Sequence, residues 1–488
     1  MKQIFIALFL MVITGCVKRE AFITVELPNQ PDINLIYTAP ISGTNYSGFS
    51  DTLVTNETGK FELKLKITQP SFISMWDEKF QNRIKFLVEP GNNYSVVMGP
   101  EKNVQITGAN EKGQMLYTTL PNTNIIEVEL RKIPNYRDNT TTLKTIKQKL
   151  NELKQSDMSK FKELLDNKDI TKSFFDLVQK DRDCYYASME AKFLLIKAYE
   201  QVRQEVKIED DLLENLKKIY NQYSPNDERL ISSSFWSEYA DSYMKDYNQF
   251  IQDDFDIKKF RELINNGIYN TYVINESKKY LTGKALEFFQ ARYLYFECYQ
   301  GSYNGRLNKE FISLFEQFEN NYPKSEYSKY IRPYIDKTIA YHQTIEQPFD
   351  KNVLFLDNYE SFNTLEEAIK PLLGKKIYID VWASWCAPCK EEFAHNEALK
   401  KILAENDTQL LYISIDRDDY DKNWKNEIKF HNLAGTHIRA NEKLSRNLMI
   451  LFSKNAEDPM ISIPWYIMVD EKGNIVEEYA KSPSQLIN

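Results

Sequence analysis

Two cysteines in Cys-x-x-Cys spacing stand where a strand pattern gives way to a helix pattern. Cys386 and Cys389 follow the apolar run 377–382, which is typical of a buried strand, and lead into a helical pattern at 391–393. The free N–H groups at a helix N-terminus stabilise a thiolate, which lowers the pKa of the first cysteine from about 8.5 to roughly 7 or below. The second cysteine lies one helical turn on and can attack a mixed disulfide formed at the first. The pattern therefore predicts thiol–disulfide exchange.

Other uses of the cysteine pair require residues that the sequence does not place around it. A c-type haem site needs a histidine after the second cysteine, where Lys390 stands. A structural zinc site needs two more ligands at short spacing; His395 is near, but the sequence has no second Cys-x-x-Cys. A peroxidase of the peroxiredoxin kind carries Thr-x-x-Cys, and Ala383 occupies the threonine position. Redox exchange remains the interpretation, with a module that has lost its activity as the alternative.

The residues around the pair resemble a known family. The stretch 379–390, Ile-Asp-Val-Trp-Ala-Ser-Trp-Cys-Ala-Pro-Cys-Lys, closely resembles the active site of thioredoxin-like proteins, particularly the TlpA/ResA-type reductases of bacterial envelopes. The stretch 461–474 places Pro464 inside a strand pattern and ends in Glu-Lys-Gly-Asn, which resembles the cis-proline strand and hairpin turn of that family. The resemblance covers residues 346–488. It implies a thioredoxin-like α/β fold and a protein-disulfide oxidoreductase that needs no cofactor or metal beyond its Cys386–Cys389 redox couple.

The resemblance also assigns the chemical roles. Cys386 is expected to be the exposed nucleophile, and Cys389 the shielded thiol that resolves the mixed disulfide. Asp380 aligns with the buried acidic residue beneath the cysteines of many thioredoxins, where it takes the proton of the resolving thiol. Burial would raise the pKa of Asp380 and suit it to that task, whereas a solvated strand-end aspartate is the alternative. The chain departs from the family at Tyr412, where thioredoxins often have a lysine.

Substrate binding is assigned to residues on both sides of the couple. By resemblance, the catalytic residue Pro464 and the backbone carbonyl of Ile463 hold the incoming peptide that contains the substrate cysteine. Trp385 precedes the nucleophile, and we expect it to shield the disulfide and offer a flat surface to the substrate. Lys390, in the first helical turn, is placed to support the thiolate electrostatically, although the exposed lysine expected here contributes little. A second departure is the C-terminus, where 481–488 leaves room for no more than a stub of the family's last helix.

The N-terminus predicts export. Lys2 precedes an apolar run at 4–13 that is too short to span a bilayer but fits a signal peptide. The Thr-Gly pair before Cys16 resembles the bacterial lipobox, so residues 1–15 are predicted to be removed and Cys16 to carry lipid. An ordinary secretory signal with a chance cysteine is the alternative. We therefore expect a lipid anchor in the bacterial cell envelope, facing the periplasm. The resemblance implies protein thiols as substrates and a membrane electron donor of the DsbD/CcdA kind.

Length and composition predict three domains in a chain of 488 residues. The expected borders give a β-rich domain at 16–119, a helical domain at 120–345 and the thioredoxin-like domain at 346–488. The net charge of −8, with both signs scattered, argues against nucleic acid as a partner.

The first of these domains carries strand patterns. Residues 60–66 alternate polar and apolar after a turn signal, and 72–75, 84–88 and 94–97 continue the pattern. They predict a small antiparallel β-sandwich. The layout resembles the β-domain that often precedes thioredoxin-like modules in Bacteroidetes lipoproteins.

The second domain is predicted to be all-α, because residues 114–266 contain no glycine. Two apolar stripes have helical spacing: Leu177, Cys184, Ala187, Ala191, Leu194 and Ala198 form one, and Leu286, Phe289, Tyr293 and Phe296 the other. Cys184 is expected to be a buried inert thiol, and a structural disulfide between Cys184 and Cys298 remains open.

These patterns together predict an envelope lipoprotein that reduces protein disulfides. The hypothesis from a different class is a lipoprotein whose front domains bind a peptide or envelope component while the thioredoxin-like domain is mainly structural. Retention of both cysteines, Asp380 and Pro464 argues against it.

Overall fold

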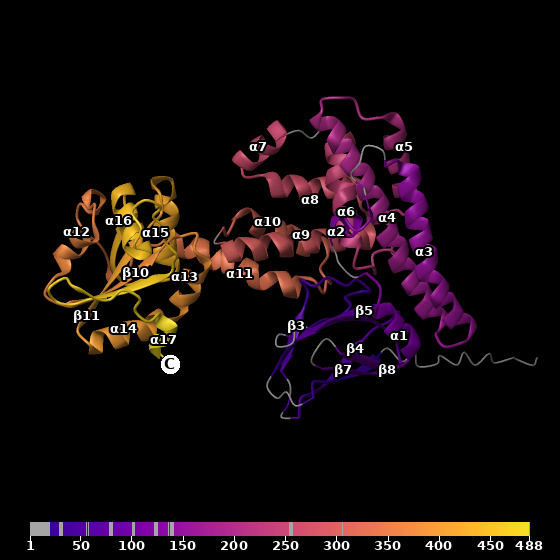
Figure 1. The fold of residues 1–488 in the computed structure, drawn as a ribbon, viewed down its shortest axis with the longest axis horizontal. Coiled ribbons are helices and arrows are strands. Elements are labelled where there is room, and N and C mark those ends of the chain that lie inside the picture. The colour runs from indigo at the N-terminus through magenta and orange to yellow at the C-terminus, as the bar shows by residue number, and fades with distance from the viewer. Residues whose placement is uncertain are drawn as a thin grey trace, which may run out of the picture. The chain divides into compact units, whose positions relative to one another are not determined.

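The computed structural model describes residues 20–487, apart from 29–32, 55, 57, 78–81, 100–102, 122–124, 135, 137–140, 253–256 and 305. The predicted signal peptide and Cys16 lie outside the described residues. The chain divides into two compact units (Figure 1). Unit 1 holds the residues up to Tyr293 together with Gln317–Tyr330, and unit 2 holds Leu294–Glu316 and Ile331–Asn488. The predicted domain borders after residues 119 and 345 stay predictions.

Unit 1 begins with two four-stranded sheets that share one hydrophobic core. One sheet has the order β4-β1-β7-β8, formed by Lys60–Lys66, Glu20–Glu26, Asn93–Met98 and Val104–Gly108. The other has the order β3-β2-β5-β6, formed by Asp51–Val54, Asn34–Thr38, Ser71–Asp77 and Arg83–Val88. Alternate residues of strands from both sheets meet in the core, as the period of a half-buried strand requires.

The predicted sandwich and its strands at 60–66, 72–75, 84–88 and 94–97 are confirmed, but its purely antiparallel pairing is wrong. β1 pairs with β7 in parallel, with Phe22 opposite Asn93 and Glu26 opposite Val97. The parallel pair arises because the chain passes through the second sheet before it returns to β1. Hydrophobic periodicity records which face of a strand is buried and carries no information about which strand lies next to it.

Helices make up the rest of unit 1. Its helices are α1 (Glu111–Thr118), α2 (Ile126–Leu130), α3 (Leu143–Asp166), α4 (Lys172–Arg203), α5 (Asp210–Gln222), α6 (Trp236–Asp241), the π-helix η2 (Ser242–Gln252), α7 (Ile257–Asn265) and α8 (Tyr269–Tyr280). The long α4 begins at an N-cap, where the Thr171 side chain accepts a hydrogen bond from the Phe174 N–H. All members of the predicted stripe on α4 are buried, which confirms that interpretation.

Three further helices contribute residues to both units: α9 (Gly283–Asn304), α10 (Glu310–Asn321) and α11 (Ser328–Ile345). On α9 the predicted stripe is only partly right. Phe289 and Tyr293 are buried, Leu286 is half-buried, and Phe296 is 45 % exposed. Phe296 follows Phe289 by seven residues and lies on nearly the same face of the helix, so helical spacing alone does not predict its exposure. Cys184 and Cys298 are both buried free thiols, so the structure contains no disulfide between them.

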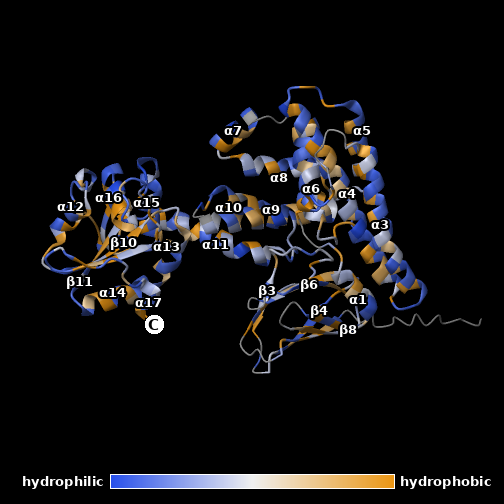
Figure 2. Cartoon of the chain, viewed as in Figure 1, coloured by the Kyte–Doolittle hydropathy of each residue, from blue (hydrophilic) through white to orange (hydrophobic). Residues whose placement is uncertain are grey.

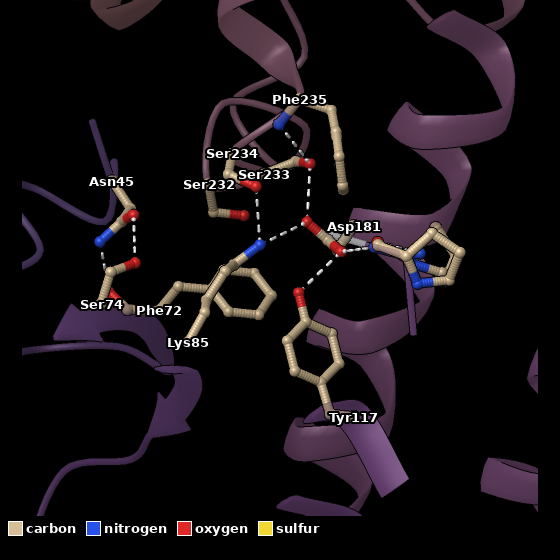
Figure 3. Close-up of polar contacts among 12 residues, drawn as sticks. Asn45, Phe72, Ser74, Lys85, Tyr117, Asp181, Ser232, Ser233, Ser234 and Phe235 are labelled. Carbon is tan, nitrogen blue, oxygen red and sulfur yellow. Dashed lines mark hydrogen bonds and ion pairs between the residues drawn. The ribbon is translucent and has the colours of Figure 1, made fainter. Parts of the chain in front are cut away.

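A buried charge cluster ties β6 to α4 within unit 1 (Figure 3). Lys85 Nζ lies 3.2 Å from Asp181 Oδ1 and donates to the Ser234 hydroxyl at 2.7 Å. Arg182 and the Tyr117 hydroxyl both reach Asp181 Oδ2, at 2.6 and 2.9 Å. Burial lowers the pKa of Lys85 to about 8, and the nearby carboxylate opposes that shift. The aspartate is thus shared by two cations, of which Arg182 is fully buried and the Lys85 side chain is 11 % exposed.

Unit 2 contains a six-stranded mixed sheet. Its order is β14-β13-β10-β11-β12-β9, formed by Ile475–Glu477, Trp465–Val469, Lys376–Trp382, Thr408–Ser414, Gly435–Arg439 and Val353–Phe355. The last four strands in this order are parallel to one another. β13 is antiparallel to β10, and β14 is antiparallel to β13. The helices are α12 (Leu365–Ile369), α13 (Ala387–Glu392), α14 (Asn396–Glu405), α15 (Asp421–Phe430), α16 (Glu442–Ser453) and α17 (Pro483–Ile487).

The central strand β10 separates two hydrophobic cores, and Figure 2 shows hydrophobic segments around it. Ile377, Ile379 and Val381 belong to one core. Tyr378 and Trp382 belong to the other, which also contains both cysteines of the Cys-x-x-Cys pair. Because successive strand residues point to opposite faces, Asp380 lies on the same face as the cysteines.

The predicted fold class is confirmed: a strand-rich sandwich, a helical middle region and a thioredoxin-like α/β part. The C-terminal helix is the predicted stub, since α17 spans five residues and packs against α14. Within the part of the chain that the structure describes, no helix combines the length and hydrophobicity needed to cross a membrane.

Candidate active site

The two cysteines lie at the junction of β10 and α13 and form a disulfide bond. Cys386 is the N-cap residue of α13, and its Sγ accepts a hydrogen bond from the Cys389 N–H at 3.2 Å. A free N–H of the first helical turn thus points at the sulfur of the first cysteine, where it would stabilise a thiolate. Among the described contacts, no N–H group donates a hydrogen bond to the sulfur of Cys389. The geometry favours Cys386 as the more acidic thiol.

The expectation of an exposed Cys386 is wrong for this oxidised form. Cys386 is only 4 % exposed and Cys389 is fully buried. Both sulfur atoms are covered because they bond to each other and pack into the core that contains Trp382 and Phe393. Trp385, which precedes the nucleophile, is 53 % exposed and presents its ring to solvent beside the couple.

Asp380 is the buried acid of this site. It faces Tyr412 on β11 and Tyr466 on β13 in the strand register, and Tyr378 precedes it on the same face. In the described part of the chain neither carboxylate oxygen has a hydrogen-bond partner. Burial, reinforced by the negative charge of Glu392, raises the pKa of Asp380 well above its usual range. Such a carboxyl takes up a proton more readily than an exposed aspartate does and can exchange it with a neighbouring thiol.

The register places Tyr412 directly opposite Asp380, where a lysine was expected from the family pattern. A lysine there would lower the pKa of the aspartate, and a neutral phenol does not. The ring of Tyr412 stacks on His437 at 4.7 Å, and burial lowers the pKa of His437 to about 4. His437 is therefore neutral at pH 7.

A buried aspartate that sequence reasoning missed fixes the loop before Cys386. Asp416, two residues after the end of β11, accepts hydrogen bonds from the Ser384 N–H and Ser384 hydroxyl, both at 2.7 Å. It also accepts from the Ser414 hydroxyl at 2.7 Å. Carboxyl ends of parallel neighbouring strands lie at the same sheet edge, so an acidic residue just after a predicted strand was the available signal. Asp416 positions the backbone that leads into the nucleophile.

Lys390 was expected to be exposed, and that expectation is wrong. Its side chain is 11 % exposed and its Nζ lies 3.5 Å from Glu427 Oε2 of α15. His431 Nε2 lies 3.2 Å from the same oxygen. Desolvation lowers the pKa of Lys390, and Glu427 opposes the change. Lys390 is buried because it contacts α15, where Glu427 lies 37 positions later in the sequence (427 − 390).

The predicted substrate-binding residues Ile463 and Pro464 lie just before β13, the strand that pairs with β10. A cis peptide bond joins Ile463 and Pro464, just before β13. Ile463 is half-buried and packs against the core that contains Cys386 and Cys389. Within the described residues, no group of three or more histidine, cysteine, aspartate or glutamate side chains is placed to hold a metal ion.

A cysteine couple at a strand–helix junction, above a buried acid and beside a cis-proline, is the arrangement that the family resemblance predicts. Residues 366–485 match the Redoxin family. The redoxin domain so defined contains every predicted site residue from Asp380 to Pro464, and the family assignment of this part of the chain is confirmed.

Relatives of the redoxin domain carry the names of redox proteins. "Thioredoxin-like protein YneN" of Bacillus subtilis is 28% identical over 113 residues, which cover 22% of this chain and 59% of the relative. "Thiol-disulfide oxidoreductase ResA" of Bacillus cereus is 23% identical over 114 residues, which cover 22% of this chain and 57% of the relative. The chain thus spans less than two thirds of the length of these relatives.

The chain is also similar to parts of two solved structures. One is the solution structure of a proposed thiol-disulfide oxidoreductase from Bacteroides vulgatus, at 30% identity and a TM-score of 0.21, covering 24% of this chain and 72% of that one. Another is a thiol-disulfide oxidoreductase from Bacteroides fragilis, at 21% identity and a TM-score of 0.19, covering 24% and 80%.

Proposed function

We propose that the protein is a thiol–disulfide oxidoreductase that reduces disulfide bonds in other polypeptides. The observation that supports this most directly is the redox couple itself. Cys386 and Cys389 are bonded at the N-terminus of α13, and a buried unpaired carboxyl, Asp380, lies on the same face of the sheet. Each feature serves a separate step of disulfide exchange.

The proposed reaction has two steps and transfers two electrons. The Cys386 thiolate attacks one sulfur of a substrate disulfide, forming a mixed disulfide and releasing one substrate thiolate, which takes a proton from solvent. Cys389 then gives its proton to Asp380 and attacks Cys386 Sγ, which breaks the mixed disulfide and releases the second substrate sulfur as a thiolate that takes a proton from solvent. The enzyme is left as the Cys386–Cys389 disulfide, and a dithiol donor must reduce it again. We propose a membrane protein of the DsbD/CcdA kind as that donor.

The direction of the reaction is tested by the reduction potential of the Cys386–Cys389 couple. Potentials of thioredoxin-fold proteins run from about −270 mV for thioredoxin to about −120 mV for a strong oxidant. We expect a value near the reducing end, measured by equilibrating the full-length protein with dithiol buffers and alkylating the free thiols. Cys184 and Cys298 are buried free thiols, so Cys184→Ala/Cys298→Ala serves as a background control. A potential near −120 mV would assign the protein to disulfide formation instead.

We further propose that the protein is anchored to the bacterial envelope through lipid on Cys16, which follows Thr14-Gly15 and the apolar run 4–13. Cys16→Ser is expected to release the protein into the soluble periplasmic fraction or leave its signal peptide uncleaved. A variant that fractionates and migrates like the parent would show that Cys16 is not lipidated.

A further inference from the structure

Unit 2 contains a hollow of about 260 Å³ beside the redox helix. One wall belongs to α13, through Ala387 and Lys390. The facing wall belongs to helices that precede the redoxin domain in the sequence and includes Tyr299, Tyr303 and Tyr334. The hollow therefore combines the residue that directly follows the nucleophile with aromatic rings from outside the redoxin domain.

Contacts within unit 2 hold the two walls together. Tyr341 of α11 packs edge-on against Phe430 of α15, with ring centroids 5.1 Å apart. Lys429 of α15 donates to the carbonyl oxygen of Ile345, the last residue of α11, at 2.9 Å. The hollow is thus a built part of unit 2, lined by residues up to 132 positions apart in the sequence (431 − 299).

The size of the hollow favours a side chain over a cofactor. Cofactor and small-molecule pockets enclose about 300–1,000 Å³ and bury most of their ligand. A hollow of about 260 Å³ that opens to solvent lies below that range. It has room for one large side chain of a polypeptide.

The lining decides which side chain fits. Tyrosine rings favour another aromatic ring, and tyrosine is enriched where proteins bind polypeptides. Tyr303 is 56 % exposed, so its ring face is available to a partner. An ammonium group has three donors, and Lys390 Nζ is buried and uses none of them fully in the described part of the chain, its one contact with an acceptor being the long ion pair with Glu427 at 3.5 Å. An aromatic side chain that carries a hydrogen-bond acceptor can pack against the tyrosine rings and also accept a hydrogen bond from the Lys390 ammonium group.

We propose that this hollow receives a tyrosine side chain of the polypeptide whose cysteine is bound to Cys386, and that this contact selects substrates. The proposal rests on the proposed function, because it needs a polypeptide at Cys386. An extended chain advances about 3.3–3.6 Å per residue, and Cys386 to Lys390 is about 6 Å along a helix. The selected residue therefore lies about two positions from the substrate cysteine.

The test uses symmetrical disulfides of short peptides that differ only at the position two residues before or after the cysteine. Reduced full-length protein is mixed with the tyrosine, phenylalanine, lysine or alanine peptide, and its oxidation is followed by acid quenching and alkylation. In at least one of the two positions we expect tyrosine to be preferred over alanine by about five- to thirtyfold, the effect of one anchoring aromatic contact. Tyrosine should exceed phenylalanine by about two- to tenfold, the effect of one hydrogen bond.

Two variants distinguish binding of the peptide in the hollow from general effects of a substitution on reactivity. Tyr303→Ala should abolish most of the preference for tyrosine over alanine, whereas Phe296→Ala should retain it. Phe296 is an exposed aromatic residue of the same helix that does not line the hollow. The rate with glutathione disulfide should be the same in both variants, and each preference is a ratio within one protein, so partial misfolding cancels.

The outcomes distinguish this proposal from the proposed function. Equal rates for all four peptides, a preference for lysine, or a preference that survives Tyr303→Ala would overturn the proposed tyrosine site while leaving disulfide reduction intact. Failure to react with any peptide would overturn both.

Discussion

Asp380→Asn is expected to slow the release of substrate from Cys386 by about 10²–10⁴-fold, the usual contribution of a positioned general base. The first attack should be largely unaffected, because Cys386 is stabilised by the Cys389 N–H and needs no proton acceptor. Cys389 must lose its proton before it attacks, and Asp380 is the buried carboxyl on that face of the sheet. Mixed disulfides with substrate should therefore accumulate, and non-reducing gels measure them.

The pH dependence provides a second readout of the same step. Resolution by the parent protein should accelerate as pH rises through the raised pKa of Asp380, because only the deprotonated carboxylate accepts a proton. The Asn variant should lose that dependence. Cys389→Ser is the matched control, since it traps the mixed disulfide without touching Asp380. Unchanged turnover with no trapped complex would show that Asp380 takes no part in proton transfer.

A stability measurement excludes unfolding as the cause of a slow variant. A carboxyl whose pKa is raised in the folded state binds its proton more tightly when folded than when unfolded. Folding stability from this group is therefore present at low pH and falls as pH rises above the unfolded value of about 3.9. Near neutral pH, Asp380→Asn should leave the free energy of unfolding unchanged or raise it.

The second large effect is expected in the buried charge cluster of unit 1. Asp181→Asn should lower the free energy of unfolding by about 3–5 kcal/mol, because it leaves buried cations without their counter-charge. Lys85 and Arg182 both contact this carboxylate, and the side chains of Asp181 and Arg182 are fully buried. Urea unfolding followed by far-ultraviolet circular dichroism measures the change.

Glu214→Gln is the control for this prediction. It removes the exposed Glu214–Lys218 pair of α5, at 2.9 Å, with both side chains more than half exposed. An exposed pair of this kind contributes about 0–1 kcal/mol. If Asp181→Asn were no more destabilising than Glu214→Gln, the cluster would not hold β6 against α4.

The parts of this protein that sequence predicted are those set by local pattern. The redox couple, the strand before it and the turn after β13 depend on residues close together in the chain. The partners of Lys390 and Ser384 do not: Glu427 and Asp416 come from other elements, and only the order of the strands and helices brings them near. The parallel pairing of β1 with β7 was missed for the same reason.

Burial of Cys386 was missed for a different reason. The Cys-x-x-Cys pattern gives the position of the nucleophile on the helix, but its exposure depends on the oxidation state and on the core around it. The tyrosine-lined hollow could not be predicted either, because α9 and α11 carry no motif that marks them as neighbours of α13.

The central claim is that the couple at Cys386 and Cys389 passes two electrons to a protein disulfide. The most direct measurement reduces the full-length protein, removes the reductant, adds insulin and counts the new thiols on insulin by alkylation and mass spectrometry. We predict about two thiols per molecule of protein oxidised, as the chemistry of one dithiol requires, and none with Cys386→Ser. Insulin thiols that form equally with Cys386→Ser, or that do not form with the parent protein, would contradict the proposed function.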